Sequence, residues 1–207
     1  MRLVIDPLHP EPRKVRTVLE VLDDGGVVVC PTDTVYAFVC LPRHVRAIAR
    51  IAQLKGVRPQ RAELSLICAD LAQVARYTKP IATSTFRLLK RALPGPYTFV
   101  LPASAEVPKL FSNNRRTVGI RIPAHAVVQA IVRASPLPLV AASVHDPDKM
   151  VDHTTDPERI TEQLGPQVDL VIDAGTGGMT GSTVIDLTAP EPRILREGLG
   201  GLDILER

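Results

Sequence analysis

The sequence predicts an α/β protein with a twisted sheet of mixed parallel and antiparallel strands and helices on its faces. Short apolar runs rich in valine and isoleucine recur along the chain, together with amphipathic stretches of helical period. Strands and helices do not alternate strictly, so a simple doubly wound parallel sheet is not expected. The 207 residues, 45% of them apolar, suffice for one core, and we expect a single domain over residues 1–207.

The N-terminal part predicts a helix followed by a sharp pair of strands. Pro12 suits the first helical position, and a glycine pair ends the helix predicted over residues 12–24. Residues 25–40, GGVVVCPTDTVYAFVC, then predict a strand, a tight polar corner and a second strand. The first strand stops at Pro31, which has no amide hydrogen. Polar side chains at this corner either bond to the local backbone or face a ligand, and this stretch alone favours the plain turn.

The other elements are expected in chain order. A second helix is predicted from Pro42, a short one after Asp70, and another opened by the Thr-Lys-Pro stretch at 78–80. A capping-box spacing over residues 155–158 predicts a last helix. The remaining predictions are a helix over 124–133 and strands over 64–68, 97–101, 117–122, 138–143, 169–173, 182–187 and 193–197.

Composition favours a cytoplasmic protein. No apolar run approaches the ~20 residues of a membrane span, and the N-terminus lacks the apolar core of a signal peptide. Cys30, Cys40 and Cys68 are widely spaced in apolar surroundings, which predicts buried thiols rather than a disulfide frame or a zinc site. The glycine-rich stretch AGTGGMTG lacks the lysine of a P-loop, and we expect it to be a flexible connection.

Positive charge is concentrated in the middle of the chain. Residues 41–145 contain 16 lysines and arginines but only three acids, although the whole chain carries a net charge of only +3. A basic face of this kind attracts phosphates of nucleotides or RNA. The alternative is that the charges scatter over the folded surface.

Hydroxyl and cationic side chains at predicted strand ends form the candidate binding set. Arg121 lies in the otherwise apolar strand TVGIRIP, so it either pairs with a distant acid or faces a carboxylate ligand. Lys55 and Arg58 follow a basic helix, and no acid lies between Pro42 and Arg61 to pair with them. Such a set suits binding and orienting a substrate better than covalent catalysis. Its members are Thr32, Thr34, Lys55, Arg58, Arg121, Ser182 and Arg196.

Residues 143–154 are polar and turn-rich, which predicts a mobile loop over a site. The histidines and aspartates in this segment, His145 among them, offer metal-binding groups, but a solvated loop is the favoured interpretation. We therefore assign no metal site.

Six segments, taken in order, resemble the YrdC-like family of threonylcarbamoyl-AMP synthases, and most closely its YciO-type branch. The similarity covers residues 15–198 or thereabouts. The segments are GGVVVCPTDTVYAFVC, KGVRPQRAELSLIC, LPGPYTFVLPAS, TVGIRIP, PLVAASVHDP and GSTVIDLTAPEPRILREG.

This resemblance implies a YrdC-like fold around a large basic concave cavity. It also implies that L-threonine and bicarbonate give a carbamate, which attacks the α-phosphate of ATP to form threonylcarbamoyl-AMP and pyrophosphate. Mg²⁺ would accompany ATP, and a separate transferase complex would pass the carbamoyl group to tRNA. The resemblance assigns threonine to Thr34, Arg121 and Ser182, and ATP to Lys55, Arg58, Thr117, Ser143 and Arg196.

Two departures from the family pattern lie on the ATP side. Two residues separate Lys55 from Arg58, where the family usually has one, and the usual Ser-x-Asn is here Ser143-Val144-His145. His145 could donate a hydrogen bond in place of the asparagine amide. Weak synthase activity, another acid or nucleotide, or carbamoyl transfer to a different acceptor is therefore open.

A different class of function is also open. A non-catalytic protein could bind double-stranded RNA, tRNA or a nucleotide through the same basic cavity. Because aromatic residues make up only 3% of the chain, RNA binding would depend on charge and shape.

Overall fold

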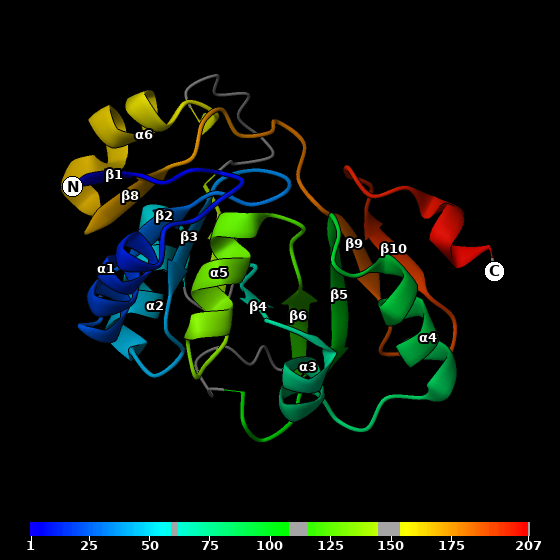
Figure 1. Cartoon of the computed structure of the whole chain (residues 1–207). Helices are drawn as coiled ribbons and strands as arrows, with labels where there is room; N and C mark the ends of the chain where they lie inside the picture. Colours follow the sequence, from blue (N-terminus) through cyan, green and yellow to red (C-terminus); the bar gives the residue numbers. More distant parts are fainter. Residues whose placement is uncertain (59–61, 108–115, 145–153, 207) are drawn as a thin grey trace.

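One ten-stranded sheet organises the protein, in the order β1-β8-β2-β3-β7-β4-β6-β5-β9-β10 (Figure 1). The computed structural model describes residues 1–58, 62–107, 116–144 and 154–206. The strands are β1 (Arg2–Val4), β2 (Val28–Cys30), β3 (Ala37–Cys40), β4 (Ser65–Ile67), β5 (Tyr97–Pro102), β6 (Thr117–Arg121), β7 (Leu139–Ser143), β8 (Leu170–Asp173), β9 (Thr183–Asp186) and β10 (Arg193–Arg196).

The sheet is mixed, as predicted. The pairs β1–β8, β2–β8, β4–β6 and β5–β9 are parallel, whereas β2–β3, β3–β7, β4–β7, β5–β6 and β9–β10 are antiparallel. Strand β1, which lies beside β8, was not predicted from the sequence. Its three residues are too few to show an alternating pattern.

Most helices lie close to where the sequence places them, but four begin later than expected, among them α5, which begins at Ala126 rather than at residue 124. Helix α2 begins at Val45 rather than Pro42, and α4 begins at Thr83, because Thr78 instead forms a β-bridge with Ala103. The predicted capping box at 155–158 is wrong by one residue, since Asp156 is the N-cap of α6 and accepts from the Glu158 amide. The helices are α1 (Pro12–Asp23), α2 (Val45–Leu54), α3 (Leu71–Tyr77), α4 (Thr83–Ala92), α5 (Ala126–Ala134) and α6 (Pro157–Leu164), with short 3-10 turns at Gly165–Gln167 and Leu202–Leu205.

Two apolar clusters cover the two faces of the sheet. On one face, Val18 of α1 and Val128 of α5 pack over Val39 and Ile67. On the other face, side chains of α2, α3 and α4 pack over the strands, with Phe99 fully buried among them. Burial of these apolar side chains is the main source of folding free energy.

One part of the sheet is not covered by helices of the described residues, and we call it the open sheet face. In β5, β6 and β9, buried residues alternate with partly exposed ones, as expected when one face contacts the core and the other does not. The partly exposed residues Thr98, Thr117, Gly119 and Val184 define this face. Among the described residues, no helix has the length and apolar character needed to cross a membrane.

The three cysteines are buried with free thiols. Burial raises the pKa of Cys40 and Cys68 to about 12, and it also raises the pKa of Cys30. Thiolate, the reactive form, is therefore suppressed in the folded state.

We predict that a thiol reagent at pH 8 modifies none of the three cysteines of the folded protein within the time that modifies all of them in denaturant. The measurement is the absorbance of the released chromophore with and without urea. Rapid labelling of even one thiol in the native protein, at a rate independent of unfolding, would contradict the predicted burial.

Candidate functional site

The corner between β2 and β3, residues 31–36, is ordered by its own hydroxyl groups. The Thr32 hydroxyl donates to the Val35 carbonyl oxygen at 2.7 Å and accepts from the Thr34 amide at 3.2 Å. It also lies 3.1 Å from the Thr34 hydroxyl oxygen. Thr32 therefore forms the predicted turn, and the Thr34 hydroxyl is held at a fixed position.

Arg121 meets this corner from β6. Its Nη2 donates to Asp33 Oδ1 at 3.0 Å and to Thr34 Oγ1 at 2.9 Å. The expected pairing with a distant acid is thus confirmed, with a partner 88 residues earlier in the chain. The Arg121 Nε is buried without a hydrogen-bond partner, so one donor of the guanidinium is still unsatisfied.

Burial is the largest influence on the guanidinium of Arg121, and it lowers the pKa. Asp33 raises this pKa, while the nearby positive charge of Arg196 lowers it further. Arginine nevertheless stays charged, since its ordinary pKa is above about 12. The result is a buried cation with only 6% of its surface exposed, compensated by one carboxylate.

Asp33 also ties the corner to the segment just before α5, because its Oδ2 accepts from the Ala124 amide at 2.8 Å. Sequence reasoning recognised Asp33 only as part of a polar turn and missed this role. The available signal was a single cation in an apolar strand together with an acid in a corner. A single sequence does not show that two residues so far apart in the chain are partners.

Ser182 and Arg196 form a second cluster. The Arg196 Nε and Nη2 donate to the Ser182 carbonyl oxygen at 3.2 and 3.0 Å, and the Ser182 hydroxyl lies 2.7 Å from that of Thr98. Thr98, which belongs to the open sheet face, was not among the predicted site residues. Since Phe99 pairs with Ile120 in register, Thr98 and Arg121 are the next pair along and share one face of the sheet.

The predicted ATP-binding residues extend the site along the sheet. Lys55 Nζ donates to the Ser143 carbonyl oxygen at 3.0 Å. Ser65 of β4 pairs with Gly119 of β6 and with Ala141 of β7. Thr117 lies two residues before Gly119 on a parallel strand, and Ser143 lies two residues after Ala141 on an antiparallel one, so both are at the same end of the sheet. Arg58 is exposed, and His145 lies outside the described residues.

The arginines in and before the basic helix α2 are partly paired with acids, although the sequence around them contains no acid. Arg43 pairs with Asp23 at 2.6 Å, and Arg50 pairs with Asp169 at 2.6 Å. Acids distant in sequence thus neutralise two arginines that have no acid nearby in the chain. Part of the predicted basic charge is therefore balanced, and the large basic cavity stays a prediction.

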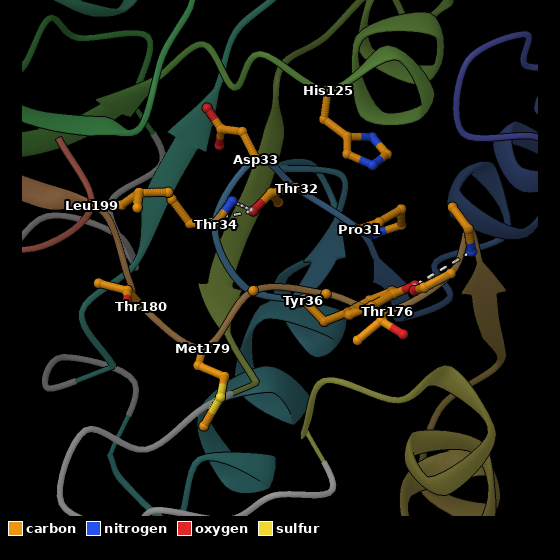
Figure 2. A pocket seen from close by; sticks show the side chains of 14 residues that line it. Pro31, Thr32, Asp33, Thr34, Tyr36, His125, Thr176, Met179, Thr180 and Leu199 are labelled. Atoms are coloured by element: carbon orange, nitrogen blue, oxygen red, sulfur yellow. Dashed lines mark hydrogen bonds between the residues drawn. The ribbon is translucent and has the colours of Figure 1, made fainter.

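A cavity of about 350 Å³ lies against the corner (Figure 2). Figure 2 shows the His125 ring projecting toward it from the start of α5. Burial lowers the pKa of His125, so the imidazole is neutral at pH 7, although Asp33 acts in the opposite direction. The lining residues are Pro31, Thr32, Asp33, Thr34, Tyr36, His125, Leu199 and residues 174–180.

The glycine-rich loop, residues 174–181, forms one wall of this cavity and is firmly attached to the corner. The Tyr36 hydroxyl donates to the Gly175 carbonyl oxygen at 2.8 Å, and the Gly177 amide donates to Thr155 at 2.7 Å. A side chain at Gly178 would come within 2.1 Å of the Thr34 carbonyl oxygen. The glycines are thus needed for close packing, and the expectation that this loop is only a flexible connection is wrong.

The arrangement can bind an anion and orient it. One buried cation, Arg121, has an unsatisfied donor; its guanidinium contacts the Thr34 hydroxyl, and it shares a sheet face with Thr98, whose hydroxyl pairs with that of Ser182. A charge-assisted hydrogen bond to a carboxylate would satisfy that donor. Cations and hydroxyls on neighbouring strands then extend from this point toward Ser143.

Comparison with known proteins gives a consistent result. The family model Sua5_yciO_yrdC, described as "Telomere recombination", matches residues 20–198. The chain is 37% identical over 199 residues to an uncharacterized protein of Haemophilus influenzae, covering 95% of this chain and 94% of that protein. It is also 34% identical over 179 residues to the threonylcarbamoyl-AMP synthase of Halorhodospira halophila, covering 86% and 92%.

Solved structures agree. The crystal structure of Escherichia coli YciO superposes with a TM-score of 0.91 at 35% identity, covering 99% of this chain and 98% of that one. The structure of Pyrococcus abyssi Sua5 complexed with L-threonine gives a TM-score of 0.90 at 30% identity; it covers all of this chain, which spans 60% of that protein. With the family model matching most of the chain, and relatives of this similarity along nearly its whole length, the protein belongs to the Sua5/YciO/YrdC family.

Proposed function

We propose that the protein is an ATP-dependent L-threonylcarbamoyl-AMP synthase. The observation that carries this proposal is the buried guanidinium of Arg121, whose Nε lacks a partner beside the fixed hydroxyl of Thr34. The unsatisfied Nε–H of Arg121 and the hydroxyl of Thr34 together suit the binding of a small carboxylate. The relatives support it, since several are threonylcarbamoyl-AMP synthases and the P. abyssi structure contains L-threonine.

Three side chains would hold threonine. Arg121 binds the carboxylate, while the hydroxyls of Thr34 and Ser182 bond to the polar groups of the substrate. Each is oriented before the substrate arrives: Thr34 by Thr32 and Arg121, and Ser182 by Thr98. Pre-orientation lowers the entropy that binding must remove.

ATP would occupy the open sheet face. Lys55, Arg58 and Arg196 supply positive charge for the phosphates, and Thr117 and Ser143 supply hydroxyls. The amine of threonine adds to bicarbonate with loss of water, and a carboxylate oxygen of the resulting carbamate attacks the α-phosphorus. The bond to the bridging oxygen breaks, and pyrophosphate leaves with the electron pair. The cations neutralise charge that develops on the phosphates.

Mg²⁺ would accompany ATP and reduce the negative charge of the phosphates. Within the described parts of the chain, no cluster of three or more histidine, cysteine, aspartate or glutamate side chains could hold a metal ion. Mg²⁺ is usually held mainly by substrate phosphates and water. Transfer of the product to tRNA would fall to a separate transferase complex.

RNA binding without catalysis is the alternative, and the two functions are separable by experiment. Affinity for RNA falls steeply with salt, whereas a synthase releases pyrophosphate only when threonine and bicarbonate are present. The ion pairs of Arg43, which precedes α2, and of Arg50 on α2 leave less free charge for RNA in this part of the surface.

We predict threonine-dependent pyrophosphate release from ATP and bicarbonate, with kcat/KM for threonine reduced about 100-fold or more in Arg121→Ala. Truncating one member of a buried, hydrogen-bonded charge pair costs about 2–5 kcal/mol. Arg121→Lys, which keeps the charge, should lose less, and Arg43→Ala, whose partner Asp23 is exposed, should match the wild type. Equal losses for threonine and ATP would argue against a carboxylate role, and salt-sensitive RNA binding without pyrophosphate release would favour the alternative.

We also predict that Lys55→Ala weakens ATP binding about 10- to 100-fold and leaves threonine binding unchanged. The reason is the loss of one charge-assisted hydrogen bond to a phosphate, about 1.5–3 kcal/mol at most. Calorimetric titration with a non-hydrolysable ATP analogue measures the first affinity, and a separate titration with threonine measures the second. Arg50→Ala is the matched control, since it removes a nearby cation of α2, the helix that Lys55 follows, and this cation is already paired with Asp169. A parallel loss of threonine affinity would place Lys55 outside the ATP subsite.

A further inference from the structure

Asp33 has more hydrogen-bonding capacity than its two known contacts use. Oδ1 accepts from Arg121 and Oδ2 accepts from the Ala124 amide. An ionised carboxylate offers about four acceptor positions, so about two are left. Asp33 also lines the cavity at the corner, together with Thr32 and Thr34. A ligand in this cavity can therefore reach the carboxylate of Asp33.

The charges around this pair limit which ligands fit. A carboxylate that binds Arg121 must come close to Asp33, which is in direct contact with the same guanidinium at 3.0 Å. Two carboxylates that contact the same guanidinium lie close together and repel each other. Water screens this repulsion poorly, because the Arg121 and Asp33 side chains are only 7% and 9% exposed. A positive group on the ligand, placed against Asp33, removes this repulsion. His125 lines the same cavity, and burial lowers the pKa of its imidazole, so this side chain is disfavoured as the source of that positive charge.

We propose that Asp33 binds the α-amino group of the substrate, so that Arg121 and Asp33 together form a receptor for the zwitterion of an α-amino acid. The carboxylate and amine of such a molecule are attached to the same carbon atom, so they reach two partners that touch each other. A carboxylate accepts a hydrogen bond from an ammonium and from a neutral amine alike, so the contact persists when the amine loses its proton to attack bicarbonate. Asp33 then sets the preference for amino acids over acids without an amine. This inference rests on the proposed function and specifies its substrate class.

The test compares L-threonine with 2,3-dihydroxybutanoate, which replaces the amine by a hydroxyl, in calorimetric titrations of the full chain. We expect the wild type to bind threonine about 10- to 100-fold more tightly, the range for one hydrogen bond between charged groups. In Asp33→Asn, threonine affinity should fall and the affinities for the two ligands should agree within about threefold, since the remaining contacts are common to both. Asp23→Asn is the matched control, because it removes an aspartate that also pairs with an arginine but is exposed on the surface.

The other outcomes contradict the inference, and they separate a failure of the Asp33 contact from a failure of the proposed function. Equal weakening of both ligands in Asp33→Asn would mean that Asp33 only positions Arg121. If that variant fails to fold, the wild type still decides: equal affinity for both ligands overturns the amine contact while leaving a carboxylate site. A wild type that binds neither ligand overturns the proposed function together with the inference.

Discussion

The site depends on the buried ion pair between Arg121 and Asp33. An unpaired guanidinium at this depth would cost several kcal/mol, roughly, so the strand that contains Arg121 requires the corner that contains Asp33. The second carboxylate oxygen holds the start of α5. One aspartate thus joins β6, α5 and the corner, and thereby fixes the Thr34 hydroxyl and the orientation of the guanidinium.

The glycine-rich loop and the C-terminal segment complete this arrangement from the other side. Gly178 packs on the backbone of Thr34, and the Thr183 hydroxyl donates to the Gly200 carbonyl oxygen at 2.6 Å. These contacts bring the Ser182–Arg196 cluster onto the sheet face that Arg121 occupies. The two ends of the site differ in structure: the end with Arg121 and Asp33 is buried and pre-oriented, whereas the other end is a partly exposed sheet face with cations at its edge. The first suits discrimination between small ligands, and the second suits a large charged one.

The predicted elements were mostly correct because local signals determined them. Proline and glycine marked the limits of α1, and alternating or continuous apolar runs marked β2, β5, β6 and β8. The errors have tertiary causes. Strand β1 forms because β8 offers it an edge. The α4 helix starts late because Thr78 pairs with Ala103 instead.

The sequence by itself determined the fold class, the burial of the cysteines, and the hydroxyl and cationic side chains at strand ends that became the candidate site. These follow from periodicity and residue type, which are local properties. Only the tertiary structure decided which charges meet. It paired Arg121 with Asp33, Arg43 with Asp23 and Arg50 with Asp169, and it brought Thr98 to Ser182. The reason is physical: a charge acts on whatever lies within a few ångströms in space, and distance along the chain does not determine that separation.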